Sequence, residues 1–189
     1  FDSPKTPSQT YEYDLVSKEK KLVKELEIPS GHNRDDYIVE RLNCESNDGK
    51  QIPITIIRHK KTKIDGSANL LLYGYSSYGS SVNPGFSSVH LSLIDRDIIW
   101  AIAHCRGSTD RGMNWWEDGK MMNKKNTFQD YIACAKFLIE KNYTNAGKII
   151  GFGGSAGGLL MGAVINKAPE LFLGMIMSVP FVDCLTTNL

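Results

Sequence analysis

The sequence predicts an α/β fold, with a mostly parallel sheet and helices on its faces. Short, wholly apolar runs recur from residue 70 onward, and such runs are typical of strands buried on both faces of a parallel sheet. Stretches with helical periodicity lie between them, and this alternation is expected for the class. A glycine-rich segment between an apolar run and the helix after it puts a candidate site at the carboxyl ends of the strands.

The N-terminal segment has a different pattern. Residues 1–10 hold two prolines and several small polar residues, and are expected to form a loop. Residues 11–15 alternate like a strand, residues 22–26 are the predicted antiparallel partner, and residues 16–21 connect them. Because two strands alone cannot bury a core, this hairpin is expected to belong to a larger sheet.

Pro29, Ser30 and Gly31 mark a predicted boundary after the hairpin. Residues 37–42 and 51–58 are again strand-like, and the Asn-Asp-Gly sequence at 47–49 predicts the turn between them.

The α/β part follows from residue 70. The apolar runs predict strands at residues 70–73, 98–103, 148–152 and 174–179. One helix is predicted over residues 127–139, where Phe128, Tyr131, Ile132, Ala135 and Leu138 share one stripe. A second helix is predicted from Ser155 to about Lys167, ending before Pro169.

Composition excludes several classes of function. A net charge of +1 over 189 residues gives no general attraction to nucleic acid or to an anionic membrane, and no apolar run is long enough to cross a bilayer. We see no signal peptide, and the chain begins with Phe1 instead of methionine, which suggests an incomplete sequence. The four cysteines form no CxxC pair and are predicted to be buried thiols, typical of a cytoplasmic protein: Cys44, Cys105, Cys134 and Cys184.

The segment Gly153–Gly157 has the pattern G-x-S-x-G between a predicted strand and a predicted helix, which favours a nucleophile elbow with Ser155 at its apex. The overlapping pattern Gly151-x-Gly153-x-x-Ala156 also fits a dinucleotide-binding loop, for which Glu170 would be the ribose-binding acid. An ordinary glycine-rich turn is the third possibility. The apical serine favours the elbow, because a phosphate loop does not require it.

Several blocks, taken in order, resemble the prolyl oligopeptidase family of serine peptidases, and most closely its oligopeptidase B branch. They are LYGYSSYG at 72–79, HCRG at 104–107, WEDGK at 116–120, KNTFQDY at 125–131, GGSAGG at 153–158 and VPFVD at 179–183. The resemblance implies a partial α/β-hydrolase fold, preceded by a short antiparallel hairpin from a β-propeller. Residues 1–29 would be the last propeller strands, and residues 30–189 the N-terminal part of the peptidase domain.

The resemblance also implies the site. Ser155 would be the nucleophile, the backbone N–H of Ala156 one oxyanion donor, and the Tyr75 hydroxyl the other. Tyr73 is interpreted as packing. No metal or organic cofactor is implied, and the expected substrates are short peptides. Three residues stand where the family usually has glycine, namely Ser76, Ser108 and Thr109, and strain is expected at any of them that has a positive φ.

Other polar residues are interpreted as structural. The histidines, His32, His59, His90 and His104, all precede Ser155, whereas the catalytic base of the family follows the nucleophile. His104 is predicted to be a hydrogen-bonded histidine at a strand end, and Arg106 to form a structural ion pair. Asp183 matches a non-catalytic family position.

No histidine follows Ser155 in the sequence, so the acid and the histidine of the triad are expected to lie beyond Leu189. The isolated chain is therefore expected to be inactive, with a complementary C-terminal fragment as a possible partner. Two alternatives are a non-catalytic remnant of a split gene and an esterase or lipase of the same superfamily.

Overall fold

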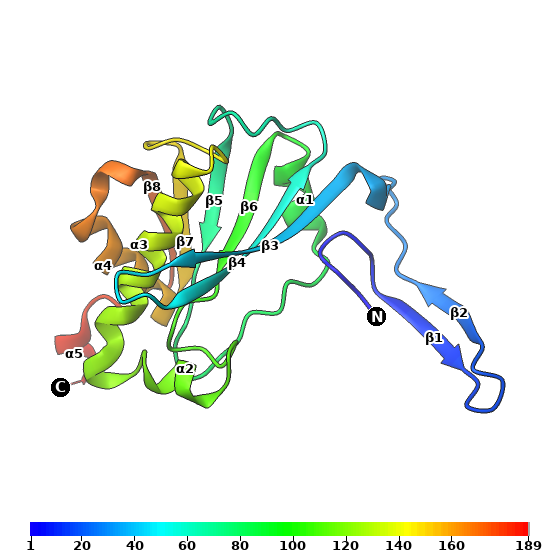
Figure 1. The fold of residues 1–189 in the computed structure, drawn as a ribbon, viewed down its shortest axis with the longest axis horizontal. Coiled ribbons are helices and arrows are strands. Elements are labelled where there is room, and N and C mark those ends of the chain that lie inside the picture. The colour runs from blue at the N-terminus through cyan, green and yellow to red at the C-terminus, as the bar shows by residue number, and fades with distance from the viewer. Residues whose placement is uncertain (189) are drawn as a thin grey trace.

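The computed structural model describes residues 1–188 (Figure 1). A central sheet has six strands in the order β3-β4-β6-β5-β7-β8. β3, β4 and β6 pair antiparallel, and β6, β5, β7 and β8 pair parallel. The strands are β3 (Tyr37–Glu45), β4 (Gln51–His59), β5 (Asn69–Tyr73), β6 (Ile98–Ala103), β7 (Ile149–Gly154) and β8 (Phe172–Ser178). The predicted α/β class is confirmed.

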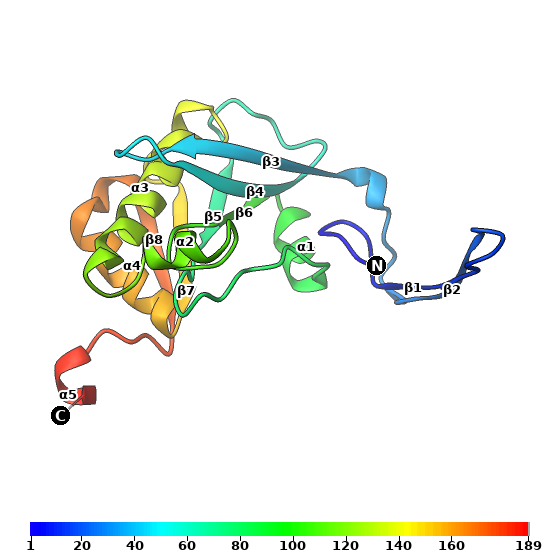
Figure 2. The same ribbon diagram turned by 60° about the horizontal axis from the view of Figure 1, so that its bottom comes forward.

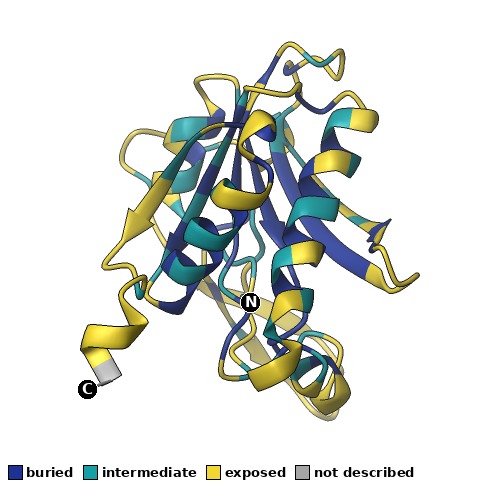
Figure 3. Cartoon of the chain, turned by 90° about the vertical axis from the view of Figure 1, so that its left-hand side faces the viewer, coloured by how far each residue is buried: buried dark blue, intermediate teal, exposed yellow. Residues whose placement is uncertain are grey.

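Helices cover the two faces unequally (Figure 2). α3 (Lys124–Glu140) and α4 (Ala156–Lys167) pack on one face, and α1 (Ser88–Ile94) packs on the other. Successive strand residues serve opposite faces, since Leu70 and Leu72 join the α3–α4 core whereas Leu71 joins the α1 core. Figure 3 shows this arrangement as buried strands behind helices whose outer sides are exposed. This two-sided burial explains why the strands are wholly apolar.

The remaining elements are short. They are α2 (Met113–Glu117), α5 (Cys184–Asn188) and 3-10 turns at Arg34–Asp36, Met121–Asn123 and Pro169–Leu171. Neither α1 nor α2 nor α5 was predicted. α1 begins where Ser87 caps it, the Ser87 hydroxyl accepting a hydrogen bond from the His90 N–H at 3.3 Å. α3 begins three residues before the predicted start, and α4 matches its predicted end at Lys167.

The N-terminal hairpin consists of β1 (Gln9–Tyr13) and β2 (Lys20–Glu25), about two residues earlier than predicted. The shift has a local cause, because the Asp14 carboxylate accepts hydrogen bonds from the N–H groups of Val16 and Ser17 at 2.8 and 2.7 Å and so starts the turn at residue 14. Within residues 1–188 these two strands pair only with each other, and the hairpin projects from the body of the molecule (Figure 1).

Three of the four cysteines are buried as predicted, but Cys184 is exposed at the start of α5, so the expectation is wrong there. Cys44 and Cys134 lie in contact, with their sulfur atoms 3.5 Å apart. No helix within residues 1–188 is both long enough and apolar enough to cross a membrane.

Two glycines of α4 differ in the space around them, which allows a matched test. A Cβ at Gly158 would lie 2.5 Å from Pro180 Cα, whereas one at Gly162 would lie 3.3 Å from a methyl group of Val182. Both substitutions to alanine gain helix propensity of about 1 kcal/mol. We therefore expect Gly162→Ala to leave the free energy of unfolding unchanged or slightly raised. Gly158→Ala should lower it by about 1–3 kcal/mol through overpacking. Urea denaturation measures both, and equal effects would contradict the close packing of residue 180 on α4.

Candidate active site

Ser155 lies on the turn between β7 and α4, with φ 53° and ψ −117°, a strained conformation for a residue with a Cβ. Its N–H donates to the Ser178 carbonyl oxygen at 2.9 Å, and its carbonyl oxygen accepts from the Phe181 N–H at 3.0 Å. The residue is exposed, and its hydroxyl forms no hydrogen bond with another described residue. The turn therefore presents a free hydroxyl at the carboxyl end of the sheet.

The glycines around Ser155 are required by close backbone contacts. A Cβ at Gly153 would collide with the Gly157 carbonyl and would lie 2.9 Å from the Gly74 carbonyl oxygen. A Cβ at Gly157 would lie 2.6 Å from that same oxygen. Real Cβ atoms essentially never approach backbone so closely, so this sharp turn tolerates only glycine at both positions.

Tyr75 is brought to this turn because β5 and β7 are neighbouring parallel strands. Tyr75 follows the end of β5, and its Cα would be 3.3 Å from a Cβ at Gly157, in the first turn of α4. The Gly74 N–H donates to the Phe152 carbonyl oxygen at 3.0 Å and ties the two strand ends together. The segment that carries Tyr75 therefore packs directly on the segment that carries Ser155 and Ala156.

The turn after Tyr75 is strained. Ser76 has φ 51° and is 3% exposed, so the expected strain of about 1–3 kcal/mol applies there. Among the described residues neither Ser108 nor Thr109 has a positive φ, and no such strain arises at those two positions. Positive φ falls instead on Gly107, whose missing side chain makes room for the Ser76 carbonyl oxygen.

Lys124, the first residue of α3, binds this turn. Its Nζ donates to the Ser76 carbonyl oxygen and to the Ser77 hydroxyl, each at 2.7 Å. Burial lowers the pKa of the Lys124 ammonium to about 8. Lys124 was not among the predicted site residues, because it lies three residues before the predicted start of this helix.

A cavity of about 360 Å³ opens beside the Ser155 turn. Ala156, Leu159 and Phe181 line one side, and the other side includes Tyr78, Trp116 and Lys124. The Lys120 ammonium lies 3.7 Å from the centre of the Trp116 ring, a cation–π contact at the rim. The cavity is mostly apolar and can hold a side chain of a bound molecule close to Ser155.

Arg106 forms the buried ion pair that the sequence analysis predicted. It is 1% exposed, and its guanidinium donates to Asp130 at 2.5 and 2.9 Å and to Asp48 at 2.5 Å. Burial acts to lower the pKa of the Arg106 guanidinium, but Asp130 and Asp48 together outweigh it and raise that pKa above its ordinary value. The pair joins the β3–β4 turn, α3 and the loop after β6, and this loop contains Gly107 in the cavity wall.

His104 is 2% exposed and hydrogen-bonded, as predicted. Its Nε2 lies 2.7 Å from the Arg41 guanidinium, and its Nδ1 lies 3.2 Å from Asp110. Because arginine only donates, Nε2 accepts and Nδ1 carries the proton. His32 binds the Lys5 carbonyl oxygen through Nε2 at 2.8 Å, and His59 ends β4.

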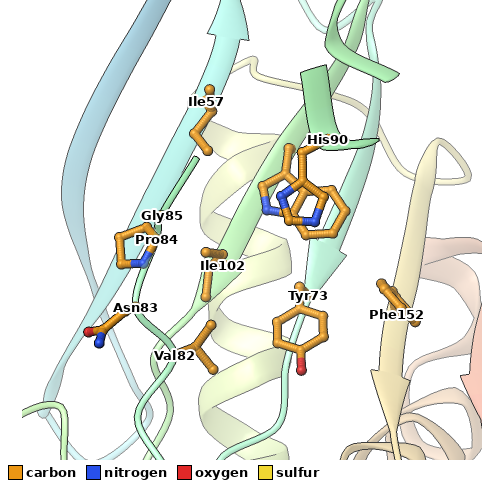
Figure 4. A pocket seen from close by; sticks show the side chains of 10 residues that line it. Ile57, Tyr73, Val82, Asn83, Pro84, Gly85, His90, Ile102 and Phe152 are labelled. Carbon is orange, nitrogen blue, oxygen red and sulfur yellow. The ribbon is translucent and has the colours of Figure 1, made fainter. Parts of the chain in front are cut away.

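His90 lies in a second cavity of about 290 Å³, on the α1 face of the sheet (Figure 4). Its ring stacks on Trp100 with the ring centres 3.7 Å apart, and burial lowers its pKa. Tyr73 and Phe152 line the same cavity. Tyr73 is therefore a packing residue on this face, as expected.

Asp183 and Glu170, the two acidic residues considered from the sequence, are both exposed. Asp183 is exposed and caps α5, its carboxylate accepting from the Thr186 N–H at 3.0 Å, which lowers the Asp183 pKa. Glu170 is exposed in a turn before β8, not at a strand end, so the ribose-binding role required of a dinucleotide loop does not fit. In residues 1–188 no group of three or more His, Cys, Asp or Glu side chains is arranged to hold a metal ion.

The fold and the Ser155 turn define part of an α/β-hydrolase. The sequence profile of the prolyl oligopeptidase family matches residues 84–189. The chain belongs to this family.

Relatives match over the whole chain. Dipeptidyl aminopeptidase BI from Pseudoxanthomonas mexicana is 42% identical over 190 residues, which cover 100% of this chain and 26% of the relative. Protease 2 from Moraxella lacunata is 42% identical over 189 residues, covering 100% of this chain and 27% of the relative. The chain thus spans about a quarter of the length of these relatives, which are named as peptidases.

Solved structures of oligopeptidase B have the same fold over nearly the whole of this chain. Oligopeptidase B from Leishmania major matches with a TM-score of 0.91 and 41% identity, over 98% of this chain and 26% of that chain. Oligopeptidase B from Trypanosoma brucei, with covalently bound antipain, matches with a TM-score of 0.92 and 40% identity over the same shares.

The buried ion pair gives a stability prediction. Arg106→Met leaves Asp130, which is 0% exposed, without its cation, and should lower the free energy of unfolding by about 3–5 kcal/mol. Lys60→Met removes the exposed pair with Asp36 (2.7 Å) and should cost less than about 1 kcal/mol. Urea denaturation compares them, and similar losses would show that the Arg106 pair does not anchor the buried part of the fold.

Proposed function

We propose that residues 1–189 are part of a serine peptidase that hydrolyses short peptides through an acyl-enzyme on Ser155. The observation that carries the proposal is the strained turn that presents the Ser155 hydroxyl between β7 and α4. In the same proposal residues 1–29 are the last strands of a β-propeller and residues 30–189 the N-terminal part of the hydrolase domain. The exposed, two-stranded hairpin supports this division, because it needs neighbouring strands to bury it.

The chemistry follows from the groups in place. The Ser155 oxygen attacks the scissile carbonyl carbon while a base takes its proton, and the carbonyl oxygen becomes an oxyanion. The Ala156 N–H, in the first turn of α4 where backbone donors lack intrahelical acceptors, is the first oxyanion donor. The Tyr75 hydroxyl is the second. The amine leaves with a proton from the base, and water then releases the acyl group.

The base and its acid would come from chain outside residues 1–189, since no histidine follows Ser155. A complementary C-terminal segment is therefore the proposed partner, and no cofactor takes part. The proposed location is the cytoplasm, because three buried thiols that form no disulfide fit a reducing compartment.

The oxyanion assignment is tested in the protein at its natural length, with a short peptide anilide as substrate. Ser155→Ala should abolish hydrolysis. Tyr75→Phe should lower kcat about 100- to 1,000-fold with little change in KM, because the donor acts on charge that develops in the transition state. Tyr73→Phe is the comparison variant and should change kcat much less, since the Tyr73 ring packs near Trp100 and Phe152 in the cavity on the α1 face.

The outcomes separate the alternatives. Equal rates for Tyr75→Phe and wild type would remove Tyr75 from the oxyanion site. Hydrolysis of a p-nitrophenyl ester without hydrolysis of the peptide amide would replace the peptidase with an esterase or lipase. Failure on both substrates would favour a non-catalytic remnant.

A second test concerns the polypeptide 1–189 alone. Without a base, the Ser155 hydroxyl is a weak nucleophile, and a fluorophosphonate probe should label it far more slowly than it labels the natural-length protein. Mass spectrometry of the labelled peptide reports the rate. Rapid, stoichiometric labelling of the isolated polypeptide would show that it needs no further chain.

A further inference from the structure

The Lys124 ammonium is a cation in an unfavourable place. It is half-buried in the wall of the cavity beside Ser155, and no carboxylate of the described residues pairs with it. It also stands at the first residue of α3, where the positive end of the helix dipole disfavours a cation. Its burial, the lack of a counter-ion and the helix dipole all disfavour a lysine at this position. Solubility of the surface therefore does not explain why residue 124 is a lysine.

Its contacts indicate what it does. Both hydrogen bonds of 2.7 Å go to the turn after Tyr75, one to the Ser76 carbonyl oxygen and one to the Ser77 hydroxyl. This turn is the strained one, with positive φ at Ser76 (51°) and at Tyr78 (57°), neither of which is glycine. A turn in this conformation relaxes unless its surroundings hold it.

The Ser76 carbonyl is held on two sides. Lys124 binds its oxygen, and the bare Cα of Gly107 leaves the space that the oxygen occupies. The Gly79 N–H donates to the Gly107 carbonyl oxygen at 3.0 Å, which closes the turn on the same loop. The ammonium is therefore a side-chain donor that helps to fix the orientation of the peptide directly after Tyr75.

We propose that Lys124 is a positioning residue, whose ammonium holds the Ser76–Ser77 turn so that the Tyr75 hydroxyl points to the oxyanion formed at Ser155. This inference rests on the proposed function. Lys124 lines the cavity beside Ser155, but in this scheme it does not touch the reacting atoms and acts on the reaction through Tyr75. Loss of the ammonium lets Ser76 leave its positive φ and moves the hydroxyl away from the oxyanion.

The test is a double-mutant cycle in the protein at its natural length, with rates per active site titrated by a fluorophosphonate burst. Lys124→Met should lower kcat about 10- to 100-fold with KM nearly unchanged, as expected for a misplaced oxyanion donor. In a Tyr75→Phe background the same substitution should lower kcat by no more than about two-fold, because the group it positions is already gone. Lys125→Met, at the exposed neighbouring position, is the control and should match wild type.

Titration of active sites removes unfolded molecules from the comparison. If Lys124→Met yields no folded protein, Lys124→Gln, which keeps a donor but no charge, takes its place in the same cycle. The inference would be overturned if the losses of kcat from Lys124→Met and Tyr75→Phe multiply in the double variant, or if Lys124→Met alone has the wild-type kcat. Either result would leave the peptidase proposal intact. If Ser155→Ala and Tyr75→Phe are both as active as wild type, the peptidase proposal itself fails.

Discussion

The Gly74 carbonyl oxygen is the point around which this structure is organised. It lies at the end of β5, close to Gly153 at the end of β7 and to Gly157 in the first turn of α4. The end of β5 can approach the turn between β7 and α4 so closely only because Gly153 and Gly157 have no side chains. This contact sets the distance between the Tyr75 turn and the Ser155 turn, and both segments of the candidate site depend on it.

A buried cation, Arg106, and a half-buried one, Lys124, hold the surroundings of this contact in different ways. Arg106 is neutralised by Asp130 and Asp48, and the Thr127 hydroxyl donates to its carbonyl oxygen at 2.6 Å, so it fastens α3 to the loop after β6. Lys124 has only neutral oxygens as acceptors. The neutralised Arg106 pair is suited to a structural role. The Lys124 ammonium has no anionic partner, which destabilises the fold, so we explain it by the need to hold the turn after Tyr75.

The sequence predicted those features that depend on local pattern. Wholly apolar runs identified the parallel strands, and the G-x-S-x-G spacing identified the Ser155 turn, because both requirements are visible in neighbouring residues. α1 was missed because its seven residues carry little periodicity, and the hairpin was misplaced because the Asp14 turn acts through side-chain hydrogen bonds. Lys124 could not be predicted, since its partner is a backbone oxygen 48 residues away in sequence.

In the proposed site, residues 1–189 supply the nucleophile and the oxyanion donors, and further chain would supply the base. Of the groups that residues 1–189 supply in this proposal, the Ser155 turn and the Ala156 N–H are fixed by backbone contacts, whereas the turn that carries Tyr75 is also held by the Lys124 side chain. An oxyanion site works because its donors are aimed before reaction, and donors already held in place by residues 1–189 would need no reorganisation when the base is added. A base contributed from outside these residues therefore has only to reach the exposed Ser155 hydroxyl. In the longer solved relatives, the part that matches this chain has the same fold along nearly its whole length. The presence of further chain in those proteins therefore leaves this part of the fold unchanged.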